Sequence, residues 1–299
     1  MTREGGCAEE VEFVVSDSPE LLREAMDVMR DAWGMPDYTE AVPAHLLKAV
    51  IDNGGFLALA VSCRQVVGFA FGFIGYSEER GYYLYSHMVG VRREYRGKNI
   101  ALQLKLMQRE WALRRGYRLV QWTFDHCQGL NARFNFGKLG VISRSFLENY
   151  YGEIRDSLNV GLPTDRLKVE WWVDSPRVEN RLSGRDQPPS YSRVAPLAHL
   201  ALESKPSEGL RLPSDPNLDE SRDLVLVEFP GDINELKARS MEAALAWKLA
   251  LRRALGFYLA RGYLVVEHVP LMEGGERRNF YLLWRTKLEE ALSGEYPWR

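Results

Sequence analysis

The sequence predicts an α/β (α+β) fold: a sheet flanked by helices, followed by a smaller C-terminal β-α-β-β unit. Short apolar runs rich in β-branched and aromatic residues alternate with segments that have apolar residues at helical spacing. Polar turns join successive apolar runs directly, as in hairpins. A stretch at 174–222 holds seven of the fourteen prolines and has no sustained periodicity. These observations predict a domain at 10–173, a Pro-rich linker or irregular excursion at 174–222, and a small α/β unit at 223–299.

The elements of the first part follow from apolar periodicity and its interruptions. Pro19 suits a first helical turn, Gly34 suits a helix end, and Cys63-Arg64-Gln65 suits a hairpin turn. In chain order we expect a strand at Glu12–Val15, helices at Pro19–Trp33 and Ala44–Ile51, strands at Phe56–Ser62, Val66–Tyr76 and Tyr82–Val91, a helix from Ile100 to Arg115, a strand at Arg118–Phe124, a short helix at Asn131–Leu139 and a strand at Leu167–Val173.

Order resumes after the Pro-rich stretch. We expect strand Leu224–Phe229, a helix from Ser240 to Arg261, and strands Tyr263–Val269 and Phe280–Arg285. This C-terminal unit shows no chemistry of its own. Its helix is Ala- and Leu-rich with Arg252 and Arg253 on the expected outer face, which is typical of a packing helix with one solvated side. Covering a substrate cleft and forming a homodimer contact are two further roles that this pattern leaves open.

Composition excludes several classes of protein. The formal net charge is −2 and the sequence pI about 6.3, so no nucleic-acid partner is expected. No apolar run approaches the roughly 18 residues of a membrane span. The N-terminus lacks the apolar core of a signal peptide. Cys7, Cys63 and Cys127 show neither metal-type spacing nor an even disulfide set, so we expect a cytoplasmic protein without a metal.

The most informative segment is the junction between the strand ending at Val91 and the helix beginning at Ile100. The turn Arg96-Gly97-Lys98-Asn99-Ile100-Ala101 is basic and leads directly into the helix. Unpaired N–H groups and the helix dipole favour an anion at such an N-terminus, and Arg96 and Lys98 add positive charge. The turn predicts a phosphate site. Taken alone, it also fits an ordinary β–α connection.

The order of elements resembles the GNAT superfamily of acyl-CoA-dependent N-acyltransferases. VRREYRGKNIA (Val91–Ala101) is similar to the family's pyrophosphate turn, with Arg96 first and Ala101 last. Asn99 stands where the family usually has Gly, and Asn tolerates positive φ better than other residues. NARFNFGKLG (Asn131–Gly140) is similar to the family's pantetheine-contacting helix. LYSHMVGV, WTFD and GLPTDR…VEWW further resemble a bacterial and archaeal subfamily with a C-terminal extension and no assigned substrate.

The resemblance implies a mixed, mainly antiparallel twisted sheet and an acyl-CoA co-substrate, with acetyl-CoA the expected one. Backbone amides of Gly97–Ala101 would hold the pyrophosphate, helped by Arg96 and Lys98, and the pantetheine arm would follow the strand Met88–Val91. A substrate amine would attack the thioester directly, and an amide near Val89 would stabilise the oxyanion. The implied CoA-binding residues are Val89, Gly90, Val91, Arg96, Gly97, Lys98, Asn99, Ile100, Ala101 and Asn131.

Proton transfer needs further residues. His87 is the first candidate for general base because its pKa range suits the task and it has the strand parity of Val89. The alternative is a histidine satisfied by hydrogen bonds inside the sheet. Asp125 and His126 come next, although Asp-His-Cys-Gln-Gly also reads as a turn.

The general acid for the thiolate is less defined. Phe136 stands where many family members have a Tyr, so Tyr150 or Tyr151 becomes the candidate, unless both are packing aromatics and water supplies the proton. Asp165, Arg166 and Glu170 are acceptor-site candidates, or else an ordinary turn and a solvated charge.

Two functions of different class fit these residues. One is an acyltransferase acting on a small-molecule or protein amine, with O-acylation not excluded. The other is a CoA-binding or interaction module of weak or no turnover, for which Asn99 and Phe136 would be the signs.

Overall fold

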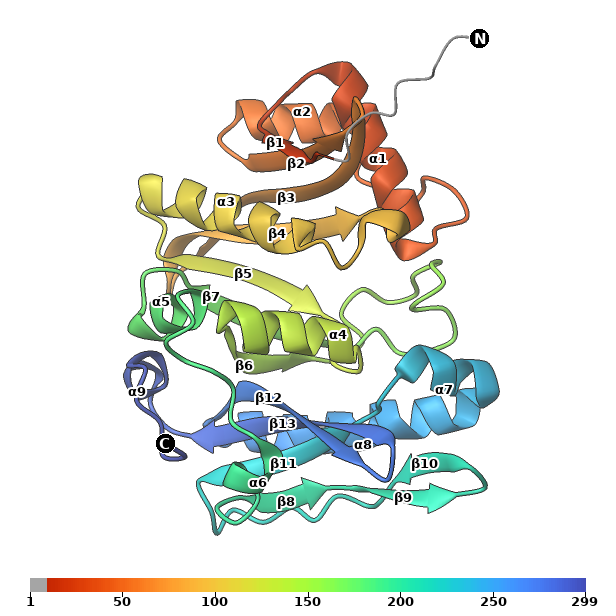
Figure 1. The fold of residues 1–299 in the computed structure, drawn as a ribbon, viewed down its shortest axis with the longest axis vertical. Helices are drawn as coiled ribbons and strands as arrows, with labels where there is room; N and C mark the ends of the chain where they lie inside the picture. The colour runs from red at the N-terminus through yellow and green to blue at the C-terminus, as the bar shows by residue number, and fades with distance from the viewer. Residues whose placement is uncertain (1–9) are drawn as a thin grey trace. The chain divides into compact units, whose positions relative to one another are not determined.

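A computed structural model describes residues 10–299 (Figure 1). The predicted absence of a signal peptide concerns a segment that lies outside the described residues. Contacts divide the chain into two compact units: a first unit ending at Val120 that also takes in Arg155–Leu158, and a second unit with the rest. This division differs from the predicted boundary at residue 173, because residues 121–154 and the strand at 166–172 group with the C-terminal part of the chain.

From residue 10 onward, the first unit contains four complete strands and three α-helices. Its elements are β1 (Glu12–Val14), α1 (Pro19–Trp33), α2 (Ala44–Asp52), β2 (Phe56–Ser62), β3 (Gln65–Ser77), β4 (Gly81–Val91), the 3-10 turn η1 (Arg93–Tyr95) and α3 (Ile100–Arg114).

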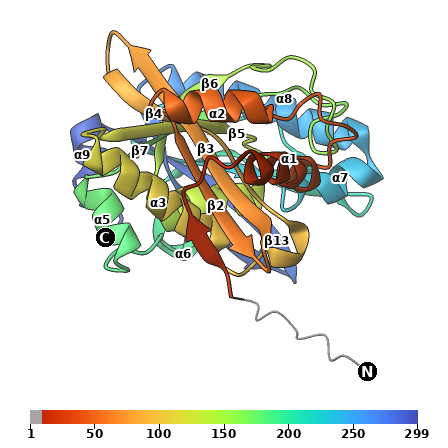
Figure 2. The ribbon, with the colours of Figure 1, turned by 90° about the horizontal axis from the view of Figure 1, so that it is seen from above.

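The strands β1 to β4 pair in sequence order, each antiparallel to the next. Cys63 and Arg64 both take positive φ in the tight turn between β2 and β3, which confirms the predicted hairpin. Helices α1 and α2 pack on one face through a core that includes Met29, Leu47 and Phe71. Figure 2 shows α1 and α2 on one side of β3 and α3 on the other.

Helix α3 approaches the opposite face of the sheet closely. A Cβ atom on Gly68 would lie 3.1 Å from Ile100 Cγ2, and one on Gly72 would lie 3.4 Å from Gln108 Nε2. The glycines of β3 therefore let the helix come near the strand and fix the position of its N-terminus.

The second unit begins within β5 and runs to the C-terminus. Its elements are β5 (Leu119–Phe124), α4 (Gly129–Ala132), the π-helix η2 (Arg133–Leu139), β6 (Ile142–Leu147), β7 (Arg166–Trp172), α5 (Pro176–Leu182), α6 (Tyr191–Val194), β8 (His199–Leu202), β9 (Ser204–Ser207), β10 (Leu210–Pro213), β11 (Leu224–Phe229), α7 (Ile233–Arg239), α8 (Met241–Leu259), β12 (Tyr263–Glu273), β13 (Glu276–Arg285) and α9 (Leu288–Leu292).

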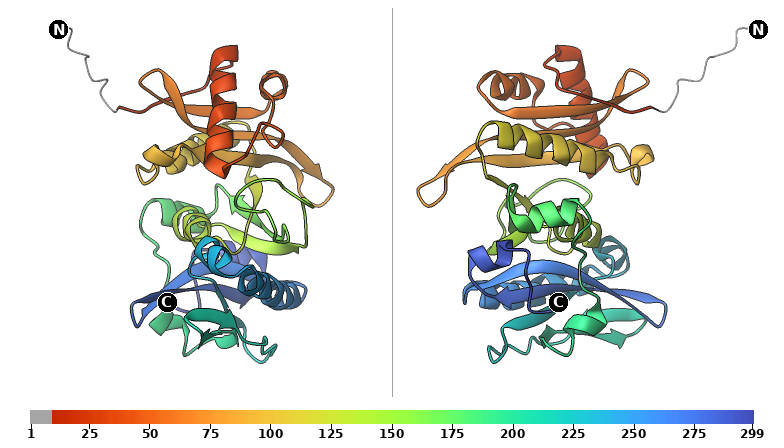
Figure 3. Two further views of the ribbon diagram at one scale, coloured as in Figure 1. Left: turned by 90° about the vertical axis from the view of Figure 1, so that its right-hand side faces the viewer. Right: turned by 60° about the vertical axis from the view of Figure 1, so that its left-hand side comes forward.

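The C-terminal strands continue the same sheet as β6 and β7. The order is β7-β6-β12-β13-β11-β8, with all pairs antiparallel except β8 and β11. The link is β12, where Val265 pairs with Ser143 of β6. Figure 3 shows α8 lying against the strands of this unit. The mixed, mainly antiparallel sheet with flanking helices confirms the predicted fold class.

Residues 174–222 form no free linker. The segment contains α5, α6 and β8 to β10, and β8 pairs in parallel with β11. Ser175 caps α5 by accepting a hydrogen bond from the Val178 amide. These elements are four to seven residues long, so they leave no periodic pattern in the sequence.

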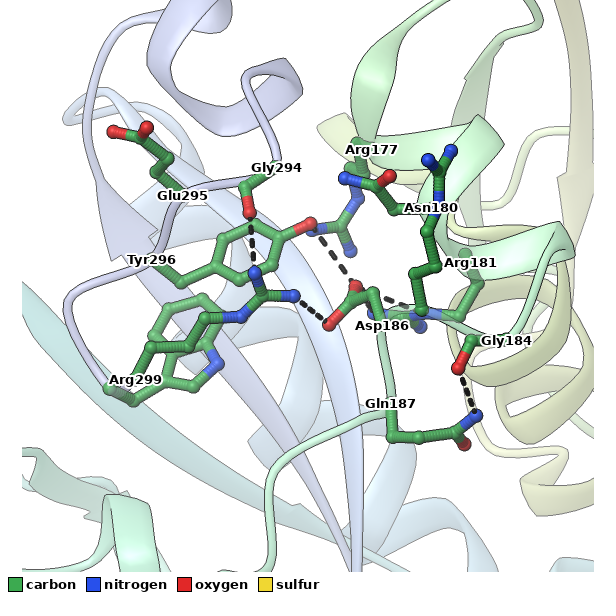
Figure 4. A network of polar contacts seen from close by, with 12 residues as sticks. Arg177, Asn180, Arg181, Gly184, Asp186, Gln187, Gly294, Glu295, Tyr296 and Arg299 are labelled. Carbon is green, nitrogen blue, oxygen red and sulfur yellow. Dashed lines mark hydrogen bonds and ion pairs between the residues drawn. The ribbon is translucent and has the colours of Figure 1, made fainter.

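The end of the chain is fixed by a buried ionic network (Figure 4). The Arg181 guanidinium donates to Asp186 at 2.9 Å and to Glu267 at 2.6 Å. Arg299 also donates to Asp186, and the Tyr296 hydroxyl lies 3.3 Å from the same carboxylate. Burial raises the pKa of Asp186, but Arg181 and Arg299 outweigh it and lower the pKa below its ordinary value.

Among residues 10–299, no helix combines the length and the apolar character that crossing a bilayer requires.

Candidate functional site

The junction of β4 and α3 is a tight turn with two left-handed residues. Gly97 has φ of +83° and Asn99 has φ of +58° with ψ of 14°, so the left-handed conformation predicted as tolerable for Asn99 is present. A Cβ atom built on Gly97 meets no atom within 4 Å. The backbone of the turn is therefore open to whatever approaches it.

The N-terminus of α3 has unpaired donors at this turn. Helical geometry leaves the amides of Ile100, Ala101 and Leu102 without an intrahelical acceptor. Among the described residues no side chain caps this helix, as is also the case for α1 and α2 of the same unit. The dipole of a 15-residue helix adds partial positive charge there. An anion would satisfy these groups.

Arg96 has a structural role that the sequence did not indicate. Its Nε donates to the Val91 carbonyl at 3.3 Å and its Nη2 to the Ala32 carbonyl at 3.1 Å. These bonds tie the turn to the end of β4 and to the end of α1. Lys98 is exposed, with its Nζ 5.1 Å from the centre of the Tyr95 ring. Both side chains contribute positive charge at the turn.

A β-bulge interrupts β4 at His87. Met88 pairs with Phe71 and Ser86 with Gly72, so His87 is an extra residue without a partner on β3. The bulge changes the parity of the strand. Val89 and Val91 face α3, whereas the His87 ring contacts the rings on the α1 and α2 side. The expectation that His87 shares the face of Val89 is therefore wrong, because parity counting assumed an uninterrupted strand.

The His87 imidazole is partly exposed and lies among aromatic rings. The centres of Phe71, Phe73 and Tyr85 are 6.2, 5.9 and 6.3 Å from its own. Removal from water on these sides lowers the pKa of His87 below its ordinary 6.5. The described residues provide its ring with aromatic contacts and no hydrogen bond. A neutral imidazole near solvent can accept a proton.

Gly90, the residue before the end of β4, is fixed by packing. Its Cβ position would lie 2.7 Å from the Phe69 ring and 3.0 Å from the Trp33 ring. The end of β4, Val89 to Val91, is thus a well-packed strand segment that leads from the bulge toward the turn. The structure brings these three residues together with Arg96–Ala101 and His87 in the first unit.

Asp125 is not available as a base. Its carboxylate accepts from Lys248 Nζ at 2.6 Å and from the Cys127 amide at 3.0 Å. Burial raises its pKa, but Lys248, His126 and Arg166 outweigh burial and lower the pKa to about 2. The Asp125 carboxylate therefore stays ionised, pairs with Lys248 and stabilises the turn through the Cys127 amide. This is the alternative that the sequence left open.

His126 is completely buried, and burial followed by the nearby Lys248 charge lowers its pKa. Both ring nitrogens lack a hydrogen-bond partner among the described residues. The ligand atoms of Asp125, His126 and Cys127 lie within 4.8 Å of one another and could contact a metal ion. The Lys248 ammonium, however, already places a positive charge on this group.

The remaining predicted residues belong to the second unit. Asn131 is exposed in α4, directly before the π-helix η2. Tyr150 is 49% exposed, and its ring packs edge-on against Tyr151 at 4.7 Å. Phe136, at the position where a Tyr was expected, is buried against Tyr281. Tyr150 therefore remains reachable by a ligand, and position 136 is core.

The predicted acceptor residues are committed to internal pairs. Asp165 is buried and accepts from Arg252 at 2.8 and 2.9 Å. Glu170 is 1% exposed and accepts from Arg144 at 3.1 and 3.2 Å. They hold the structure and do not present charge to an acceptor. Arg252, which was expected on the outer face of α8, is the residue of α8 that pairs with Asp165.

Residues 19–140 match the model of the acetyltransferase (GNAT) family. This part of the chain belongs to the GNAT family. The match runs from the start of α1 to the end of η2, and so includes β4, the turn and α3. No curated protein matches the chain.

Several solved structures resemble about half of the chain at low identity. A GNAT-family acetyltransferase from Desulfovibrio desulfuricans has 14% identity, with 55% of this chain and 99% of that one covered and a TM-score of 0.43. Arabidopsis thaliana Naa50 with a bisubstrate analogue has 18% identity, coverages of 54% and 97% and a TM-score of 0.42. The PaiA N-acetyltransferase of Thermoplasma acidophilum with coenzyme A has 15% identity, coverages of 54% and 98% and a TM-score of 0.40.

Sequence reasoning missed residues of the GNAT domain that surround His87. Phe71, Phe73, Tyr83 and Tyr85 recur at alternate positions of β3 and β4, and this alternation was visible in the sequence. The pairing register that brings them together with His87 was not.

Proposed function

We propose that the chain is an acyl-CoA-dependent N-acyltransferase with acetyl-CoA as donor and an amine as acceptor. The observation that carries the proposal is the uncapped N-terminus of α3, reached through the exposed left-handed Gly97. The membership of residues 19–140 in the GNAT family supports the same activity.

The binding role belongs to backbone groups of the turn. The amides from Gly97 to Ala101 would donate to the pyrophosphate, with Lys98 beside them and Arg96 holding the turn in place. The pantetheine arm would follow β4 from Val91 toward Met88. At roughly 3.3 Å per residue, the stretch from Val91 to His87 is about 13 Å long. This is the right scale for a pantetheine arm to end near the bulge.

The chemistry would then take place at the bulge. The acceptor nitrogen attacks the thioester carbonyl carbon, and a backbone amide near Val89 donates to the developing oxyanion. His87 takes the proton that the nitrogen loses. When the tetrahedral intermediate collapses, the C–S bond breaks and the thiolate receives a proton from water.

Two glycines that flank α3 provide a matched test of the role of the turn. Gly97 precedes α3 and Gly116 follows it, with φ of +83° and +76°, and a Cβ atom on either meets nothing within 4 Å. Gly97→Val and Gly116→Val should therefore carry similar backbone strain, about 1–2 kcal/mol. We expect Gly97→Val to weaken acetyl-CoA binding at least tenfold by calorimetry, because a side chain would occupy the phosphate position. Gly116→Val should bind as the wild type does.

Equal acetyl-CoA affinity of the two folded variants would contradict the assignment of the turn. Thiol release from acetyl-CoA with a panel of primary amines then tests turnover. Tight binding without thiol release would favour a CoA-binding module, which Asn99 in the turn and Phe136 in the core left conceivable.

A further inference from the structure

Beyond the turn, β3 and β4 carry a continuous row of aromatic side chains on one face, which we call the aromatic strip: Tyr83, Tyr85, Phe73 and Phe71. Tyr85 pairs with Phe73 across the strands, and their ring centres are 5.2 Å apart. Phe73 and Phe71 are 6.5 Å apart. His87 contacts Tyr85, Phe73 and Phe71 and so lies at one end of the strip.

The strip passes from core to surface. Phe71 is 2% exposed and packs under α1 and α2, whereas Phe73 is 37% exposed. Further out, the Tyr83 ring lies over Gly75, whose Cβ position would be 2.5 Å from the ring. Phe73 is thus the exposed member of the strip, and half-buried Tyr83 and Tyr85 extend its apolar surface along β4.

The strip lies on the side of His87 opposite to the turn. The turn follows Val91, whereas Tyr85 and Tyr83 precede His87 on β4. If the donor occupies β4 between the turn and the bulge, the strip begins where the donor ends. Its position suits the arm of the acceptor amine.

The chemistry of the strip selects among amines. The faces of phenyl and phenol rings are electronegative and attract an ammonium group, and the rings also stack on an aromatic or apolar arm. A carboxylate gains neither contact. We propose that the aromatic strip binds the acceptor, and that this acceptor is a primary amine on an arylalkyl arm, with its nitrogen at His87 and its ring on Phe73 and Tyr85. This inference rests on the proposed acyltransferase activity.

The test measures amine binding apart from turnover. The probe is 2-phenylethylamine, titrated calorimetrically into the full-length protein saturated with CoA, with 3-phenylpropionate as the anionic counterpart and n-hexylamine as the aliphatic one. We expect 2-phenylethylamine to bind more tightly than either counterpart. Phe73→Ala should weaken its binding about fivefold to tenfold, while acetyl-CoA affinity stays unchanged.

Tyr82→Ala provides a matched control. Tyr82 is 67% exposed on the same hairpin, but its ring contacts the tilted ring of Tyr76 on the opposite face. The Tyr82→Ala variant should bind 2-phenylethylamine as tightly as the wild type does. No amine binding by the wild type, equal binding by all three proteins, or equal binding of the carboxylate would overturn the proposal. If the wild type did not bind acetyl-CoA, that result would count against the proposed acyltransferase function. The failure of the aromatic-strip proposal and the failure of the proposed function therefore give different results.

Discussion

At the scale of the residue, His87 has its chemistry because of its neighbours. Three aromatic rings shield the imidazole, and the pKa of His87 is lower than that of a histidine in water. At pH 7 the ring is therefore mostly neutral and able to accept a proton. The bulge at this position also frees the residue from the strand alternation.

The first residue-scale prediction concerns pH. In the wild type, kcat/KM should rise with pH through a pKa below 6.5, because the protonated imidazole cannot act as base. His87→Ala should lose this limb and lower kcat/KM by about 10²-fold or more. His45→Ala, at an exposed histidine of α2, is the control and should keep the wild-type profile. An unaltered profile in His87→Ala would remove His87 as the base.

At the scale of the element, prediction succeeded where a pattern was long. The strands and helices up to β5 were predicted within about two residues, because their apolar periodicity extends over several turns or alternations. β6 and the short elements of 174–222 were missed. β6 pairs with β12 and β8 pairs with β11, so these two strands depend on partners far away in the sequence and carry little signal of their own.

The candidate site shows the same limit. The turn could be predicted because its residues are consecutive and each contributes a local property. The face of His87 could not, since one unpaired residue in β4 reverses the count. Nor could the Lys248 partner of Asp125, which is 123 positions away in the sequence.

An element-scale prediction concerns the cap of α8. Ser240 accepts a hydrogen bond from the Ala243 amide at 3.1 Å, whereas Ser190 precedes α6 without a capping bond. Ser240→Ala should reduce the free energy of unfolding by about 1 kcal/mol, and Ser190→Ala by much less. Urea unfolding followed by circular dichroism measures both. Similar midpoints for the two variants would show that the cap does not stabilise α8.

At the scale of the molecule, the C-terminal extension completes the core of the second unit. Helix α8 supplies Lys248 to Asp125 and Arg252 to Asp165, and both carboxylates are largely or wholly buried. Removing one partner of a buried ion pair typically costs about 3–5 kcal/mol. The predicted domain at 10–173 would lose both partners at once.

We therefore expect a protein ending at residue 173 to lack cooperative thermal unfolding, because two buried carboxylates would be unpaired and β6 would lose β12. Calorimetry against the full-length chain measures this directly. A single sharp transition near the full-length temperature would instead establish 10–173 as an independent domain.

The pairing of β12 with β6 also constrains synthesis on the ribosome. β6 emerges more than a hundred residues before β12, which begins at Tyr263. During that interval one side of β6 has no partner strand, and an exposed strand edge invites pairing with other chains. The nascent protein should therefore depend on chaperones or on slow growth conditions until nearly its whole length has been translated.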